Sequence, residues 1–246
     1  MRKSYRELTE EIKTDGERLK LIAALGSSDD LAYHYALICE DWAAGGTLML
    51  ENSFDRHGEA GIVFLLERLR AFGTASKTDA SATAGTATDT AYLAAKILSQ
   101  LRHRDFYAAR AKELAALLTA RWEISDIALR RKQIIALGWI GSESEINLLI
   151  DSMQSDSDAL CRAWAAAALM QLSFHAVDAA FLRERTKTAF AEAIQKEGDL
   201  NAAGIMIEAA QTLFGKKWIS AAAAEAAESE SIEKARKSAL RFLGKA

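Results

Sequence analysis

The fold is decided by residues 125–173, which read SDIALRRKQIIALGWIGSESEINLLIDSMQSDSDALCRAWAAAALMQLS. The middle of this stretch carries apolar residues at positions i, i+3, i+4 and i+7, the spacing of one face of an amphipathic helix. These apolar residues are Ile146, Leu149, Ile150 and Met153. The polar run 155–158 that follows can form a turn whose side chains cap the next helix. The stretch therefore predicts a repeating unit of helix, turn, helix and turn.

The same unit recurs along the chain. Residues 127–130 (IALR) align with residues 159–162 (ALCR) at an offset of 32 positions, and Leu137 then falls on Leu169. Six helical runs that open on an acidic or polar residue are expected to begin near Asp30, Asp89, Asp126, Asp158, Asp199 and Glu230. Glycines just past such runs predict left-handed helix ends, at Gly141, Gly215 and Gly244.

Composition narrows the class of protein. The chain has 246 residues, no proline, two cysteines and a formal net charge of -3, and alanine makes up about a fifth of it. Such a composition favours an all-α protein and excludes disulfide-rich and collagen-like classes. Nucleic-acid binding is disfavoured because there is no basic excess. The N-terminus lacks the apolar core of a signal peptide and no segment could span a membrane, so we expect a cytoplasmic protein.

The unit over residues 125–173 resembles the HEAT repeat, in particular the short HEAT-like repeat named after phycobilisome lyases. In that family an arginine follows the acidic turn, an alanine-rich stretch follows the arginine, and a Leu-Gly pair ends the first helix. This sequence has Arg130 with Leu137-Gly138, and Arg162 with the alanines of 165–168. The family's frequent turn proline is missing, so a generic α-solenoid or an irregular helical bundle stays an alternative.

The resemblance implies an all-α fold, an α-α superhelix of the HEAT-like solenoid type, formed by residues 1–246 as a single domain. We expect a helical cap over residues 1–28, with a turn at Asp15-Gly16, and HEAT-like repeats over 89–246. Residues 73–90 (GTASKTDASATAGTATDT) contain no large apolar side chain. Such a segment buries too little surface to offset its ordering entropy. We therefore expect a flexible loop there, either a passive insertion or a binding or regulatory loop.

The sequence offers no catalytic constellation. It has no HExxH, no GxSxG and no phosphate-binding glycine loop, and its four histidines are scattered. We therefore predict no catalytic residue, no metal and no cofactor. Trp139 and Trp164 lie among apolar neighbours in first helices, where core packing is expected.

The hypothesis that follows is a non-catalytic scaffold that grips a protein partner on its concave face, such as an adaptor, an assembly factor or an immunity protein that neutralises a toxin. The resemblance to HEAT-type stacks implies that the second helix of each pair lines that face. The residues predicted to contact the partner are Trp218, Lys217, Tyr107, Arg110, Asn147, Asp151 and Arg183. The alternative is an enzyme on the same repeat fold, similar to phycobilin lyases or to HEAT-like DNA glycosylases. The oligomeric state is left open.

Overall fold

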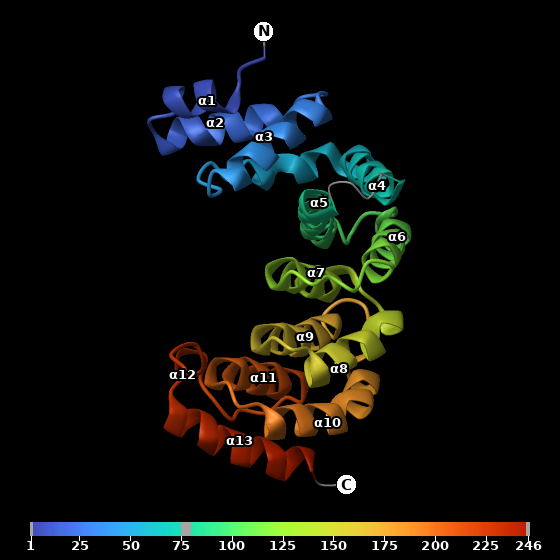
Figure 1. Ribbon diagram of the computed structural model, residues 1–246, viewed down its shortest axis with the longest axis vertical. Coiled ribbons are helices and arrows are strands. Elements are labelled where there is room, and N and C mark those ends of the chain that lie inside the picture. The colour runs from blue at the N-terminus through green and yellow to red at the C-terminus, as the bar shows by residue number, and fades with distance from the viewer. Residues whose placement is uncertain (1, 75–79, 245–246) are drawn as a thin grey trace.

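A computed structural model describes residues 2–74 and 80–244, and every regular element in these ranges is helical (Figure 1). Along the chain the helices are α1 (Tyr5–Glu11), α2 (Asp15–Gly26), α3 (Leu31–Ala43), η1 (Leu50–His57), α4 (Gly58–Thr74), α5 (Ala80–Gln100), α6 (Tyr107–Thr119), α7 (Ile127–Ile140), η3 (Glu143–Glu145), α8 (Ile146–Ser155), α9 (Ala159–Leu172), α10 (Ala179–Lys196), α11 (Leu200–Leu213), α12 (Ala221–Glu225) and α13 (Ser229–Leu243). None of them is both long and apolar enough to cross a lipid bilayer.

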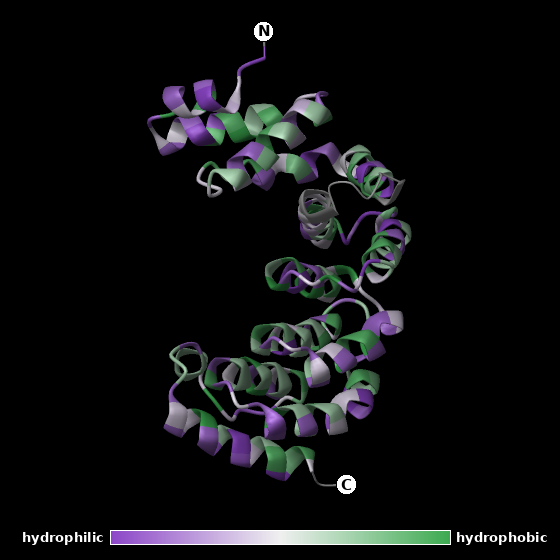
Figure 2. Cartoon of the chain, in the orientation of Figure 1, coloured by the Kyte–Doolittle hydropathy of each residue, from purple (hydrophilic) through white to green (hydrophobic). Residues whose placement is uncertain are grey.

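The helices stack in sequential pairs into a curved solenoid. An inner row of α5, α7, α9 and α11 lines the open side of the curve, and an outer row of α4, α6, α8 and α10 lies behind it (Figure 1). The terminal helices α1 and α13 carry more hydrophilic residues than the inner helices α9 and α11 (Figure 2), as the ends of a stack require. The predicted all-α superhelix is therefore confirmed.

The inner helices pack closely because small residues meet at their contacts. Gly138 on α7 lies so near α9 that an added Cβ would fall 2.8 Å from the Cα of Ala168. The alanines 165–168 of α9 are buried. The inner helices contact one another more extensively than α4 contacts α6 or α8 contacts α10. The row of helices with the closer spacing forms the inside of the curve. The small residues of the inner helices therefore place these helices on the concave side of the stack.

Aspartates begin most of the inner helices as the sequence predicts. The side chains of Asp126, Asp158 and Asp199 each accept a backbone N–H three residues on, at 3.0, 2.8 and 2.8 Å. Asp30 caps α3 in the same way at 3.1 Å. The start expected near Glu230 is confirmed, because α13 begins at Ser229 with Glu230 in its first turn. One expected start is wrong: Asp89 lies inside α5.

The flexible loop predicted over residues 73–90 is wrong for its C-terminal half, because α5 begins at Ala80. Residues 75–79 of that expectation lie outside the described residues. Alanine is the strongest helix former, and small side chains allow close packing where large apolar ones are missing. Thr90 is buried, its hydroxyl donates to the Thr86 carbonyl at 2.7 Å, and it lies 2.6 Å from the Tyr35 hydroxyl. Contacts with neighbouring helices therefore stabilise the N-terminal part of α5, although it has no large apolar side chains to bury.

Helix ends correct two further expectations. Gly215 is left-handed with φ +62°, as predicted. Gly141 and Gly244 have φ values of -66° and -81°, so the left-handed prediction is wrong there. At Gly141 the requirement is space, since an added Cβ would lie 2.6 Å from the Leu137 carbonyl oxygen. In the N-terminal segment, the turn between helices that was expected at Asp15-Gly16 is wrong. These two residues form the first turn of α2, whose N-cap is the Thr14 side chain.

Candidate functional site

The open side of the solenoid presents one exposed stripe from each inner helix. Helix α7 packs between α5 and α9, and α9 packs between α7 and α11, with outer helices behind them. The side chains left at the surface therefore face the opening, and they recur at i, i+4, i+7 and i+11. The large apolar members of this concave stripe, each half-buried, are Tyr92 on α5, Ile135 and Trp139 on α7, Leu160 and Trp164 on α9, and Ile205 on α11.

An aromatic cluster of Trp42, Tyr92 and Trp139 lies at the N-terminal part of this stripe. The ring centroids of Trp42 and Tyr92 are 6.4 Å apart, and those of Tyr92 and Trp139 are 5.1 Å apart. The Lys132 ammonium lies 5.9 Å from the Trp42 ring and 6.0 Å from the Tyr92 ring, within cation–π range. Burial, with a smaller contribution from Glu51, raises the pKa of the Tyr92 hydroxyl. The cluster joins α3, α5 and α7 into one surface.

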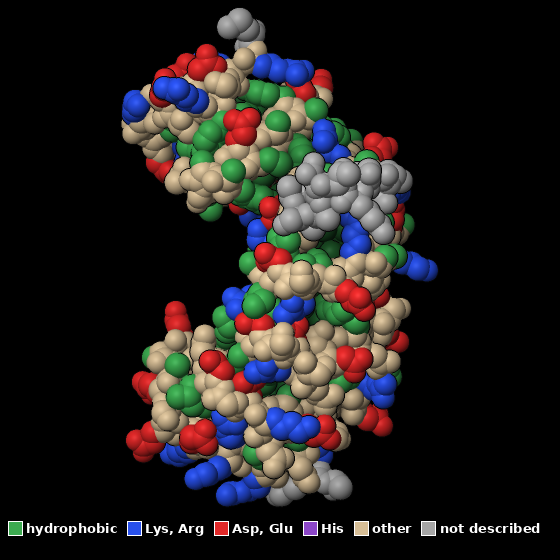
Figure 3. Space-filling model, viewed as in Figure 1, with side chains coloured by type: hydrophobic (Ala, Val, Ile, Leu, Met, Phe, Trp, Pro, Cys, Tyr) green, Lys and Arg blue, Asp and Glu red, His purple; other side chains and the backbone are tan. Residues whose placement is uncertain are grey.

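Charged groups beside the stripe are paired with one another. Arg131 binds Asp158 through two contacts of 2.9 Å, and this guanidinium holds the pKa of Asp158 far below its usual range. Lys132 contacts Asp89 at 2.5 Å, and Lys96 contacts Glu51 at 2.9 Å. Figure 3 shows hydrophobic side chains beside both basic and acidic ones along the hollow. The concave surface is therefore locally neutral around its apolar centre.

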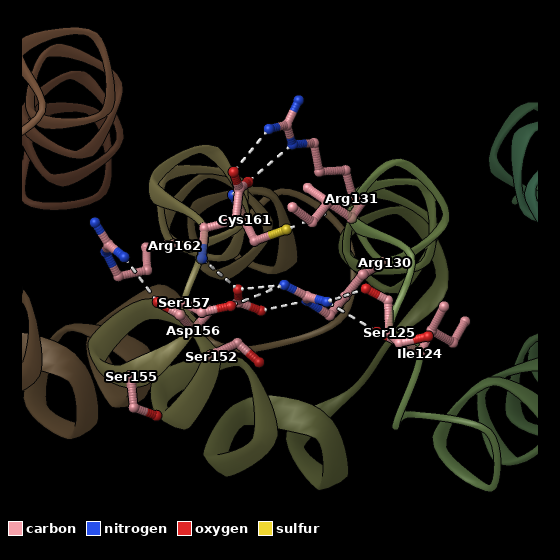
Figure 4. A network of polar contacts seen from close by, with 12 residues as sticks. Ile124, Ser125, Arg130, Arg131, Ser152, Ser155, Asp156, Ser157, Cys161 and Arg162 are labelled. Carbon is pink, nitrogen blue, oxygen red and sulfur yellow. Dashed lines mark hydrogen bonds and ion pairs between the residues drawn. The ribbon is translucent and has the colours of Figure 1, made fainter.

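A second set of ion pairs ties successive repeats together at the turns (Figure 4). Arg130 forms two bonds to Asp156, at 2.7 and 2.8 Å, and donates to the Ile124 carbonyl at 2.8 Å. One repeat later, Arg162 binds Glu197 at 2.7 and 2.9 Å. Burial raises the pKa of Glu197, but Arg162 and backbone N–H groups outweigh it, so the net pKa is lowered. These groups are occupied in joining neighbouring repeats.

Two histidines, one buried and one half-buried, are in contact in the N-terminal part of the stack. His34 Nδ1 lies 2.9 Å from His57 Nε2, and His34 Nε2 lies 3.0 Å from the Leu50 carbonyl oxygen. Because a carbonyl only accepts, His34 carries a proton on Nε2. In the neutral ring His34 Nδ1 then accepts from His57 Nε2–H. Burial is the largest cause that lowers the pKa of both rings. No group of three or more metal-ligating side chains occurs within residues 2–74 and 80–244.

Five of the residues predicted to contact a partner lie on outer helices, so their expected place on the concave face is wrong. Tyr107 and Arg110 belong to α6, Asn147 and Asp151 to α8, and Arg183 to α10; these helices lie on the convex side (Figure 1). The cause is the small-residue packing of the first helices, which makes them the inner row. Their role in binding stays a prediction.

These residues also differ in how free their side chains are. Arg110 is paired with Glu59 at 2.9 Å and with Glu113 at 3.2 Å. Arg183 donates to the Leu213 carbonyl at 3.3 Å, and Asn147 accepts from Arg185 at 2.7 Å. Asp151 is exposed and forms no ion pair with the described residues. Of the five, Asp151 is the side chain most open to a ligand.

Trp218 and Lys217 lie in the connection before α12. The Trp218 backbone N–H donates to Gln211 Oε1 at 2.8 Å, and its ring lies 5.8 Å from Phe242, centroid to centroid. Half-buried Trp218 therefore packs α13 onto the stack, while Lys217 is exposed. Contact of either residue with a partner stays a prediction.

The tryptophans of the first helices differ from the expected core positions. Trp139 and Trp164 are half-buried: one side packs on the core and the other faces the opening. Trp42 and Tyr92 are surface residues of this face that were not predicted from the sequence. In α5 the helical spacing of Asp89, Tyr92 and Lys96 places these residues on one face of the helix. This spacing indicates a concave surface only when α5 is known to belong to the inner row.

Comparison with known families supports this architecture. A family model described as HEAT repeats matches residues 81–170, from α5 into α9. Neither the curated proteins nor the solved structures gave a match. The predicted resemblance to HEAT repeats is thus confirmed over residues 81–170, which match this family model.

Proposed function

We propose that this protein is a non-catalytic scaffold that binds another protein on its concave face. HEAT repeats generally bind proteins, and the repeats here expose one continuous face toward the opening. The observation that carries the proposal is the concave stripe with its aromatic cluster. Half-exposed tryptophan and tyrosine side chains are the residue types most enriched at the centres of protein interfaces.

The surroundings of the stripe support the same conclusion. Its cations are already paired with acids, so a partner would not have to leave a charge unpaired when it covers them. The apolar side chains come from four successive inner helices, which suits an elongated polypeptide surface better than a compact small molecule. Adaptor, assembly-factor and immunity roles are all compatible with this proposal.

The proposal is tested by affinity capture from the native host followed by mass spectrometry, with variants of the concave face. Trp164→Ala removes an apolar contact, and Ala128→Arg places a long charged side chain on the exposed concave side of α7 without removing core packing. Both should abolish capture of the partner. The control Phe181→Ala changes a ring that is 44% exposed on the outer helix α10.

A partner that is captured equally by wild type, Trp164→Ala and Ala128→Arg would contradict the proposal. Loss of capture in Phe181→Ala alone would do so as well, because it would move the interface to the convex side. Circular dichroism of each variant establishes that the chain is folded.

A further inference from the structure

The outer row of helices carries two open pockets along α8. One open pocket of about 540 Å³ lies between the α6–α7 connection and α8, and another of about 470 Å³ lies between α8 and α10. Both include Asp151, so they meet along α8. We name this combined surface the outer groove. The first pocket includes Trp122, Glu123 and Asp151, and the second includes Asp151, Arg185 and Glu192.

The outer groove carries excess negative charge. Four carboxylates line it, from Glu123, Asp151, Asp156 and Glu192, against the two guanidinium groups of Arg130 and Arg185. Arg130 is neutralised by its double contact with Asp156. Within the described part of the chain, Glu123 and Asp151 have no ion-pair partner, and Glu192 accepts only from the neutral Gln154 amide, at 2.9 Å.

The groove also has an aromatic wall. Half-buried Trp122 packs against the core and lines the first pocket beside Glu123 and Asp151. A cation over an indole face is attracted by the ring and, at the same place, by nearby carboxylates. An arginine side chain can satisfy both, because its planar guanidinium stacks on aromatic rings and forms directed bonds to carboxylates.

We propose that the outer groove binds an arginine- or lysine-containing segment of a partner polypeptide, with one cationic side chain against Trp122 between Glu123 and Asp151. A second cation then lies in the pocket beside Glu192. A segment of polypeptide fits because the two pockets follow one another along α8 on an open surface. This site lies on the convex side and does not depend on the concave surface.

The test uses a fluorescein-labelled heptapeptide of alternating glycine and arginine, titrated with the full-length protein and followed by fluorescence anisotropy at low ionic strength. The wild-type protein should bind this peptide and not its counterpart with glutamate in place of arginine. Asp151→Asn and Glu192→Gln should each weaken binding by about two- to fivefold, the loss expected for one partly exposed charge contact. Trp122→Leu should weaken it without changing the charge.

Matched control variants distinguish peptide binding in the outer groove from attraction of the peptide by the overall charge of the protein. Asp105→Asn and Glu184→Gln remove the same charges from exposed positions outside the groove, and they should leave the affinity unchanged. Ala128→Arg should also leave it unchanged, so failure of the concave proposal and failure of this one are distinguishable. Equal affinity of Asp151→Asn and Asp105→Asn, or equal binding of the glutamate peptide, would overturn the proposal.

Discussion

At the scale of single residues, the contact between His34 and His57 couples folding to pH. His34 is fully buried, and its two ring nitrogens are in hydrogen-bonding contact with His57 and with the Leu50 carbonyl, an arrangement that accommodates at most one positive charge on the two rings. A second proton on this pair would place two positive rings in contact. Asp55 and Asp29 are the acids that act on His57, and their effect is smaller than that of burial. The folded protein therefore resists protonation here.

The sign of the pH effect follows from the lowered pKa values. In the unfolded chain both histidines titrate near 6.5, so below that pH the unfolded state binds more protons than the folded state. The free energy of unfolding should thus be fully maintained above pH 7 and should fall as the pH drops through 6.5 toward 5. Urea unfolding at several pH values measures this slope.

Replacement of one ring identifies the source of the slope. His34→Gln should flatten the pH dependence, because glutamine can still donate to the Leu50 carbonyl without titrating. Part of the slope should remain, since burial also lowers the pKa of His175. The matched variant His103→Gln alters an exposed ring and should leave the slope as in wild type. An unchanged slope in His34→Gln would refute the assignment.

At the scale of helices, the sequence predicted what local spacing controls. The apolar period of residues 146–153 and the capping aspartates Asp126 and Asp158 placed α7, α8 and α9 correctly. The start of α5 was not predicted, because a rule based on large apolar residues takes no account of small buried residues such as Thr90, whose hydroxyl contacts that of Tyr35. The inner row was also misassigned, because curvature depends on distances between helices, such as the approach of Gly138 to Ala168, and no local spacing reports these. The candidate concave site was missed for the same reason.

Replacing a helical glycine by alanine should have opposite effects on stability at Gly138, where α7 closely approaches α9, and at Gly85, where there is open space. In Gly138→Ala the new Cβ would lie 2.8 Å from the Ala168 Cα. We expect a net loss of about 1 to 2 kcal/mol of stability, because the cost of overpacking exceeds the gain in helix propensity. In Gly85→Ala on α5 no atom lies within 4 Å of the new Cβ. That variant should gain about 0.5 to 1 kcal/mol. Chemical denaturation of both proteins measures the two changes, and a stabilised Gly138→Ala would contradict the tight packing of α7 on α9.

At the scale of the whole molecule, a solenoid transmits stability only between neighbours. The N-terminal helix α1 contacts α3, and the inner helices α9 and α11 lie several repeats away (Figure 1). The link at that end runs through Asp41, a buried carboxylate that accepts from the Tyr5 hydroxyl at 2.8 Å and from the Leu48 N–H at 3.0 Å. A defect at this link should therefore stay local.

Tyr5→Phe tests this locality because it removes one hydroxyl and keeps the ring. The buried Asp41 then loses a donor, which should cost about 1 to 2 kcal/mol. Hydrogen–deuterium exchange should accelerate roughly 5- to 30-fold in α1 and residues 44–50, with α9 and α11 unchanged. The matched variant Tyr33→Phe loses an exposed bond to the Lys3 carbonyl and should affect only the first residues of the chain. Equal acceleration in α1 and in α11 after Tyr5→Phe would mean that the stack unfolds as one cooperative unit, because nearest-neighbour coupling alone cannot carry the defect across the intervening repeats.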